Sequence, residues 1–352
     1  MRNRSQKPAT VDDVARLAGV SKATAARVLG RYGSSSVATR AAVHAAAASL
    51  SYRPNASAKA MNTGKSESIG VVSRNVANPG FAVALEGMMA VGGGAGVSVV
   101  VAGSEYNIDL EKAAIELLLN KRVDALIVSP ANGTVTEHLH SAHRAGVPVV
   151  IWERRANGLD VPVIEADNSG AGRVVGRYLR GLGHTRVAYI STFPHSGPYQ
   201  LGVDIGASVI TDRLNAIYGA YSDAGVRPST DLVRFPARTS GAIQRTVIEL
   251  LDLDDPPTVL IASDGQIGLE ALTALRARGV SIPRELSLLM FEDPPWATLV
   301  DPPLTVVVQP TYDMGRTAME VALASIDAES PVRRVPVFPA ELVVRDSVGP
   351  RP

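Results

Sequence analysis

Apolar residues recur at helical spacing near the N-terminus of the chain. They fall three or four positions apart between residues 11 and 18, directly after Thr10, a suitable N-cap, and this predicts a first short helix. Gly19 ends that helix, and a second helix is expected over residues 21–29. A third, alanine-rich helix is expected from about residue 39 to residue 50. Two short helices around a turn that contains glycine are typical of a helix-turn-helix.

From residue 68 onward, short β-rich runs alternate with helical stretches such as 110–121, 170–182 and 266–278. Such alternation predicts parallel sheets with helices on both faces and a ligand cleft at the carboxyl ends of the strands. The predicted fold class is therefore a small all-α helix-turn-helix domain followed by a larger α/β domain whose length suits two sheets. The expected strands are 69–73, 97–102, 125–128, 147–151, 187–190, 259–262, 286–291 and 305–308.

The formal net charge of +1 hides a strong asymmetry along the 352 residues. Residues 1–64 contain ten lysines and arginines but only two acidic residues, a charge of +8, so the remaining 288 residues carry −7. A basic module attached to an acidic body is a sign of binding to a polyanion such as nucleic acid. The helical pattern argues against the alternative, a disordered basic tail.

Composition excludes several classes of site and location. The chain has no cysteine, which rules out a disulfide scaffold, a Cys-ligated zinc site, an iron–sulfur cluster and thiol catalysis. The longest apolar runs, such as 97–102 and 147–152, fall well short of the roughly 18 residues of a membrane span. No apolar stretch follows the basic N-terminus, so we expect no signal peptide, no membrane partner and a cytoplasmic location.

The second predicted helix carries the candidate DNA-reading residues. Lys22, Ala23 and Arg27 point outward near its N-terminal end, and this end of a recognition helix enters the major groove. Ala23 cannot bond a base edge and can at most contact a thymine methyl group. The alternative for Arg27 is a solvated surface arginine.

A longer pattern surrounds this helix. It begins as Thr-Val-Asp-Asp-Val-Ala-Arg-Leu-Ala-Gly-Val-Ser-Lys-Ala-Thr at Thr10, continues as Arg-Val-Leu at Arg27, and ends as Tyr-Arg-Pro-Asn-Ala-Ser-Ala at Tyr52. It resembles the N-terminal domain of the lactose-repressor (LacI/GalR) family of bacterial transcription regulators. The resemblance implies base contacts from Lys22, Ala23 and Arg27, and phosphate contacts from Thr10, Ser21, Thr24 and Tyr52.

The same resemblance divides the chain into three parts. Residues 1–53 would be the DNA-binding domain, 54–66 a hinge helix and linker, and 67–352 an effector-binding and dimerisation domain. The hinge helix of the family folds on DNA and inserts an apolar side chain from each subunit into the minor groove. In this register Met61 is that wedge, and Asn55 and Ala58 belong to the same DNA-binding segment.

The acidic body resembles the effector domain of this family, with motifs such as Ile-Gly-Val-Val from residue 69 and Phe-Glu-Asp from residue 291. That domain is the periplasmic-binding-protein type I fold, two α/β lobes joined by three crossings. Arg213 stands at the position where proteins of this family have an arginine that binds effector hydroxyls or a carboxylate. The planar fork of donors of an arginine suits either group. Glu153 and Glu292 would accept hydroxyl hydrogen bonds, which favours a neutral polyol over a phosphorylated ligand. The implied effector-binding residues are Arg74, Phe81, Glu153, Asp167, Arg213, Ser263, Asp264 and Glu292.

Several residues of the body also have purely structural interpretations. Asp264 can simply cap the helix that follows it, and Asp167 and Asp293 can serve the fold alone. Trp152 and Trp296 follow predicted strands, where they either stack on a sugar or pack in the core. In addition, residues 192–211 form a segment longer than the usual loop of the family, so the resemblance does not fix the effector.

Nothing in the body indicates catalysis. No Ser/His/Asp constellation or paired-carboxylate motif stands out, so enzyme activity is not expected. The spacing of His138, His140 and His143 does not place all three on one helix face, so we expect no metal and no cofactor. His184 lies at a helix-to-strand turn and is interpreted as structural.

Together these patterns indicate a sequence-specific, ligand-responsive transcriptional regulator, which in the resembling family is usually a repressor. The expected partners are double-stranded DNA with a pseudo-palindromic operator, a second copy of the chain in a homodimer, and a small-molecule effector, most often a sugar. A solute-binding protein of the periplasmic type is the alternative, but it would leave the basic module unexplained. An enzyme on an α/β scaffold that also binds DNA would lack catalytic groups.

Overall fold

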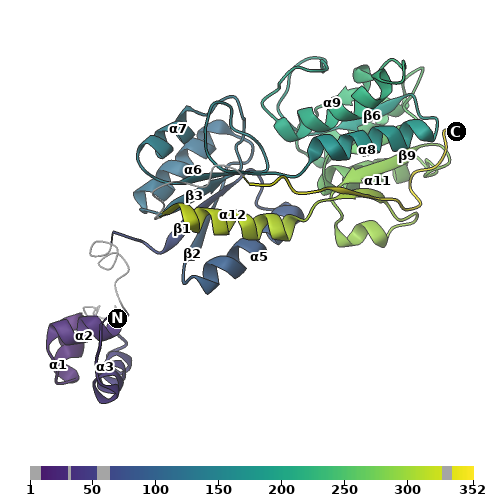
Figure 1. The fold of residues 1–352 in the computed structure, drawn as a ribbon. Helices are drawn as coiled ribbons and strands as arrows, with labels where there is room; N and C mark the ends of the chain where they lie inside the picture. Colours follow the sequence, from purple (N-terminus) through teal and green to yellow (C-terminus); the bar gives the residue numbers. More distant parts are fainter. Residues whose placement is uncertain (1–8, 31–32, 54–63, 327–334) are drawn as a thin grey trace, which may run out of the picture. The chain divides into compact units, whose positions relative to one another are not determined.

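The computed structural model describes residues 9–30, 33–53, 64–326 and 335–352, and the chain divides into two compact units, Met1–Ser66 and Glu67–Pro352 (Figure 1). We call them unit 1 and unit 2 and describe each by itself. Within the described ranges, no helix combines the length and the apolar character that crossing a membrane requires.

Unit 1 is a three-helix domain formed by α1 (Val11–Leu17), α2 (Lys22–Leu29) and α3 (Val37–Ser49). The helix-turn-helix expected from the apolar spacing is present in α1 and α2. The third helix starts two residues earlier than expected, because Ser36 accepts a hydrogen bond from the backbone of Thr39 and so caps it. The helices enclose a small core of Val14, Ala15, Ala25, Val28, Val43, Ala46 and Ala47.

Unit 2 contains two largely parallel sheets. The first has strand order β2-β1-β3-β4-β5 and the second β11-β10-β9-β8-β6-β7, in which only the β10–β11 pair is antiparallel. The strands of the first sheet are β1 (Ser68–Ser73), β2 (Ser98–Gly103), β3 (Ala125–Val128), β4 (Val149–Trp152) and β5 (Val163–Ile164). Those of the second are β6 (Val187–Ile190), β7 (Val233–Arg234), β8 (Val259–Ala262), β9 (Ser287–Phe291), β10 (Thr305–Val308) and β11 (Glu341–Val343).

Helices cover both faces of each sheet because successive side chains of a buried strand point to opposite faces. Helices α5 and α12 share a core with one face of the first sheet, and α6 and α7 with the other. Helices α8 and α9 cover one face of the second sheet, and α10 and α11 the other. The helices span α5 (Pro79–Gly94), α6 (Ile108–Asn120), α7 (Glu137–Arg144), α8 (Asn168–Gly181), α9 (Ser208–Ser222), α10 (Ser240–Leu251), α11 (Gly265–Ala277) and α12 (Thr311–Ile326), with short 3-10 turns η1 (Thr230–Leu232) and η2 (Pro295–Thr298).

The chain passes between the two lobes of unit 2 three times (Figure 1). It leaves the first lobe after β5, returns after β10 to form α12 against α5, and reaches the second lobe again at β11, which pairs with β10. The two-lobed architecture with three crossings, implied by the resemblance, is therefore present. Strands β5, β7 and β11 were not predicted, because two or three residues are too few to show a periodic pattern.

Candidate functional site

The outer face of α2 is the candidate DNA-reading surface of unit 1. Lys22, Ala23 and Arg27 are all exposed, while Ala25 and Val28 face the core, so the helical phase expected from the sequence is confirmed. These three side chains therefore face solvent on one side of α2.

Two contacts position the cationic side chains of this surface. The ammonium of Lys22 lies 2.8 Å from a carboxylate oxygen of Asp12 on α1. Because both partners are exposed, this pair contributes little to stability, and a phosphate or a base can displace it. The stem of Arg27 lies over Gly33, where an added Cβ would be 2.8 Å from the Arg27 Cδ. Gly33 thus leaves room for the arginine.

The residues proposed to contact phosphate lie at helix starts and in the core of unit 1. The side chain of Thr10 forms a capping box with Asp13, and Ser21 accepts from the backbone of Thr24, 3.1 Å away. Tyr52 packs against the small core, and burial raises the pKa of its hydroxyl. The hinge residues Asn55, Ala58 and Met61 lie outside the described residues.

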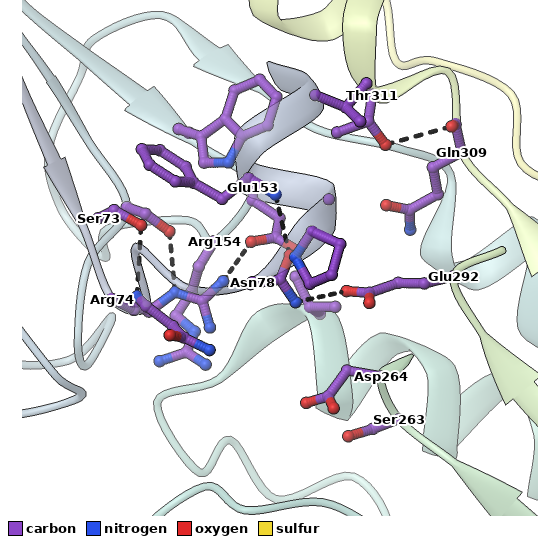
Figure 2. A pocket seen from close by; sticks show the side chains of 18 of the residues that line it. Ser73, Arg74, Asn78, Glu153, Arg154, Ser263, Asp264, Glu292, Gln309 and Thr311 are labelled. Carbon is purple, nitrogen blue, oxygen red and sulfur yellow. Dashed lines mark hydrogen bonds and ion pairs between the residues drawn. The ribbon is translucent and has the colours of Figure 1, made fainter. Parts of the chain in front are cut away.

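Unit 2 contains a cavity of about 390 Å³ whose lining comes from both lobes (Figure 2). Polar side chains from the ends of strands converge on it, as expected for the carboxyl edges of parallel sheets. Seven of the eight residues proposed as effector contacts line it: Arg74, Phe81, Glu153, Arg213, Ser263, Asp264 and Glu292.

Asp167 is the exception. Its carboxylate accepts from the backbone of Gly170 at 2.7 Å and caps α8, and it is not part of the cavity lining. The structural interpretation therefore holds for Asp167, and we leave it out of the proposed site. Asp293 lines the cavity but is held by two hydrogen bonds from Arg345, at 2.8 and 2.6 Å.

An ion pair forms the first-lobe wall of the cavity. The guanidinium of Arg74 pairs with the carboxylate of Glu153 (Figure 2). Its Nε donates to the hydroxyl of Ser129 at 2.8 Å. The same guanidinium lies 5.5 Å from the ring centroid of Tyr106. The arrangement fixes both charges at the ends of β1 and β4, so neither is a free surface group.

Carboxylates from two loops are part of the second-lobe wall. Asp264 caps α11 through the backbone of Ile267 and accepts from Arg238 at 3.2 Å, so both interpretations of Asp264 apply. Glu292 accepts from the side chain of Asn78 at 3.0 Å and from a backbone N–H at 2.9 Å. The Asn78 bond joins the two lobes, because Asn78 starts α5 (Figure 2). Burial and the neighbouring Asp264 raise the pKa of Glu292 to about 7.

Arg213 enters the cavity from α9. It is only 4 % exposed, its Nε donates to Asn168 at 2.8 Å, and its Nη1 donates to the carbonyl of Ser263 at 3.1 Å. Its guanidinium also lies 3.9 Å from the ring centroid of Phe291. The close packing of α9 on α8 depends on Gly172, where an added Cβ would be 2.7 Å from the Arg213 carbonyl oxygen.

Sequence reasoning missed two arginines of this site. Arg154 is 1 % exposed, and its Nη1 donates to the carbonyls of Pro130 at 3.2 Å and Ala131 at 2.5 Å. Arg238 follows the short strand β7 and lies 4.8 Å from the ring centroid of Tyr106. The position of Arg154 just after β4 was an available signal, whereas β7 was too short to be recognised.

The two tryptophans differ in position, and His138 and His184 both hydrogen-bond within the fold. Trp152 lines the cavity, whereas Trp296 packs against the core of the second lobe and belongs to no part of the lining. His138 is hydrogen-bonded to the buried carboxylate of Glu111 at 2.6 Å. The two ring nitrogens of His184 are hydrogen-bonded to the hydroxyl of Thr258 and to a backbone carbonyl. Within the described ranges, no cluster of histidine and acidic residues could hold a metal ion.

The long segment 192–211 of the second lobe contacts the first lobe beside the cavity. The backbone of Gly133 donates to Gly206 at 2.8 Å, and the side chain of Asn157 donates to Asp204, also at 2.8 Å. Phe193, at the start of the segment, lies 4.9 Å from the Arg154 guanidinium, measured to its ring centroid. This segment is therefore part of the cavity wall.

Comparisons with known proteins agree across both units. Residues 10–55 match the model of bacterial regulatory proteins of the lacI family, and residues 177–348 match a periplasmic binding protein-like domain. The HTH-type transcriptional regulator GalR of Escherichia coli is 32 % identical over 341 residues, which cover 97 % of this chain and 96 % of GalR. The HTH-type transcriptional repressor CytR of Escherichia coli is 26 % identical and covers 99 % of each chain.

Solved structures show the same architecture. The lac repressor dimer bound to operator and the anti-inducer ONPF has a TM-score of 0.81 and 23 % identity, covering 97 % of this chain and all of the other. A complex of the transcriptional regulator CelR with cellobiose has a TM-score of 0.68 and 28 % identity, covering 96 % of this chain and 99 % of the other. The helix-turn-helix and two-lobed folds of these proteins thus correspond to units 1 and 2.

Proposed function

This chain is a DNA-binding transcriptional regulator that belongs to the lacI family of bacterial regulatory proteins, and we propose that it is a repressor whose operator affinity is set by a small molecule bound in unit 2. The observation that carries the proposal is the combination of two sites in one chain. Unit 1 presents an exposed cationic helix face, and unit 2 encloses a polar cavity between two lobes.

The proposed DNA contacts follow from the geometry of unit 1. Lys22, Ala23 and Arg27 lie on the exposed face of α2, so we assign them to base edges in the major groove. Thr10, Ser21, Thr24 and Tyr52, together with the hinge residues Asn55, Ala58 and Met61, are assigned to phosphates and the minor groove. These assignments rest on the family pattern and on the exposure of α2.

The proposed effector site is the cavity of unit 2. Its volume lies in the range of small-molecule pockets, and it combines aromatic walls such as Trp152 and Phe81 with convergent charged groups. We propose a sugar or sugar derivative, a choice supported by the cellobiose that the related CelR binds. The proposed contacts are Arg74, Phe81, Glu153, Arg213, Ser263, Asp264 and Glu292.

We further propose a homodimer on a pseudo-palindromic operator, acting in the cytoplasm and without catalytic activity. The pseudo-palindromic sequence of an operator mirrors the two-fold symmetry of a dimer that binds it. Met89 on α5 and Leu117 on α6 are more than half exposed, as apolar side chains of an interface would be in a single chain. A solute-binding protein of the periplasmic type is not favoured, because GalR and CytR match the chain through both units.

Coupling between the two sites can be tested on the full chain. Operator duplexes are selected from a randomised library, and operator affinity is then measured with and without each sugar or nucleoside that raises the midpoint of thermal unfolding. An effector should change operator affinity about 5- to 150-fold, the usual range of allosteric coupling. A compound that binds unit 2 and leaves operator affinity unchanged would contradict effector control.

A further inference from the structure

The carboxylates that line the cavity are already engaged by groups of the protein. Glu153 pairs with Arg74, and Asp264 caps α11 and pairs with Arg238. Glu292 accepts one hydrogen bond on each of its two oxygens. These acceptors therefore have reduced capacity for ligand hydroxyls, in contrast to the neutral polyol that the sequence favoured.

Two buried guanidiniums in the same lining have no such partner. Arg154 is 1 % exposed and Arg213 is 4 % exposed, and neither forms an ion pair with a residue that the structure describes. Among the residues that the structure describes, their guanidinium groups donate to neutral amide and carbonyl oxygens. Each instead lies over an aromatic ring, which excludes water from one face of the guanidinium.

The charge of Arg154 is poorly compensated. Burial and the guanidinium of Arg74 hold the pKa of Arg154 well below its ordinary value, and the carboxylates of Glu153 and Glu111 do not offset this. The Nε of Arg154 and the Nη2 of Arg238 are buried nitrogens without a hydrogen-bond partner in the described parts of the chain. Buried unpaired charges and donors destabilise a protein unless an acceptor reaches them.

Building on the effector-controlled function proposed above, we infer that the ligand of this cavity is an anionic small molecule, a sugar acid or a sugar phosphate, whose negative group compensates the guanidiniums of Arg154 and Arg213. Guanidinium groups bind carboxylate and phosphate oxygens through charge-assisted hydrogen bonds that a neutral hydroxyl cannot match. Arg154 thereby becomes an effector-binding residue in addition to those carried over from the family pattern.

The experiment compares matched neutral and anionic probes on the full chain at constant ionic strength. The pairs are glucose with glucuronate, galactose with galacturonate, and ribose with ribose 5-phosphate. Thermal unfolding identifies the probes that bind, and titration calorimetry gives their dissociation constants. We expect at least one anionic probe to bind about tenfold or more tightly than its neutral counterpart, the difference that a charge-assisted hydrogen bond provides. The acid and phosphate arms distinguish the two kinds of anion.

Substitutions assign the effect to the two arginines. Arg154→Gln and Arg213→Gln should each weaken binding of the anionic probe about tenfold or more. Each should also reduce the ratio between the dissociation constants of the neutral and the anionic probe. Arg278→Gln is the matched control, because it removes one positive charge from an exposed pair with Asp252 outside the cavity. If Arg154→Gln does not fold, Arg154→Lys takes its place. The lysine keeps the positive charge but lacks the planar fork of donors, so binding of the anionic probe should still be weaker than in the wild-type chain.

The outcomes separate this inference from the proposed function. The inference would be overturned if a neutral sugar bound as tightly as its acid, shifted operator affinity, and kept its affinity in both Gln variants. The proposed function would still stand in that case. If no probe of either kind shifts the unfolding midpoint or operator affinity, both the inference and effector control are contradicted. Specific operator binding is judged separately, on the ligand-free chain.

Discussion

Glu292 shows how one residue of the cavity couples charge to stability. Burial and Asp264 oppose ionisation, while the donors from Asn78 and from the start of α11 favour it. The outcome is a pKa of about 7, well above that of an unfolded glutamate. Between these two values the folded chain keeps a proton that the unfolded chain has released.

Stability should therefore fall as the pH rises through this window. The contribution of Glu292 is fully present below about pH 4.5 and is lost by the time the pH has passed 7, with an upper bound of about 3 kcal/mol. Glu292→Gln, neutral at every pH, serves as the reference. Chemical denaturation from pH 5 to 8 should show the wild-type chain losing stability relative to this variant. A difference that does not change with pH would contradict the assignment.

Gly33 offers a second prediction, concerning DNA reading. Gly33 and Gly19 both have positive φ, of 71° and 66°, so alanine strains both backbones alike. Only at Gly33 would the new Cβ meet Arg27. Gly33→Ala should lower the ratio of affinities for the operator and a scrambled duplex. Gly19→Ala should lower the free energy of unfolding and leave that ratio unchanged. Equal discrimination by the two variants, measured by fluorescence anisotropy, would argue against a positioning role for Gly33.

Several charged residues of the cavity lining could be predicted one by one, because strand ends in parallel sheets converge on one edge. Arg74 and Glu153 follow β1 and β4 directly and were found in this way. The pairing between them could not be predicted, since it depends on the registration of two strands that β3 separates. For Asp167 the sequence left two interpretations open, because an aspartate at a helix start has the same sequence signature whether it caps the helix or binds a ligand, and the structure shows the cap.

At the scale of elements, the long segment before α9 was recognised as unusual but not understood. Its role depends on contact with the first lobe, where Gly206 accepts from Gly133. Periodicity located α6, α8 and α11 and most strands to within about two residues, because buried runs and caps are local signals, whereas it gave no bounds for α5, α9, α10 and α12. Contacts between lobes involve residues far apart in the sequence, and no local pattern encodes them.

The segment also supports a prediction with an internal control. An added Cβ at Gly206 would lie 2.1 Å from the side-chain oxygen of Asn132, which is held by two bonds from Thr134, whereas nothing lies within 4 Å at Gly202. Both glycines have positive φ, so the backbone strain is shared. Gly206→Ala should therefore lower the free energy of unfolding about 1–3 kcal/mol more than Gly202→Ala. Matching urea midpoints for the two variants would show that this contact between the lobes is unimportant.

At the scale of the whole molecule, the charge asymmetry seen in the sequence coincides with the division into two units. The excess of positive charge lies in the stretch that contains unit 1, and the acidic body contains the cavity. DNA should therefore be held mainly through unit 1, with an affinity that falls steeply as salt rises. The acidic body should repel DNA that approaches it elsewhere, which favours binding through α2.

The central claim is that Arg27 on α2 reads DNA sequence. The most direct measurement is the ratio of affinities for the selected operator and a scrambled duplex, for the wild-type chain, Arg27→Ala and Arg16→Ala. Arg16 is an exposed arginine on α1, so its variant loses the same charge away from the reading face. We predict that the wild-type chain binds the operator about 10³ or more times as tightly as the scrambled duplex. In Arg27→Ala this ratio should be about ten- to hundredfold smaller, and in Arg16→Ala it should be unchanged. An unchanged ratio in Arg27→Ala would contradict the account.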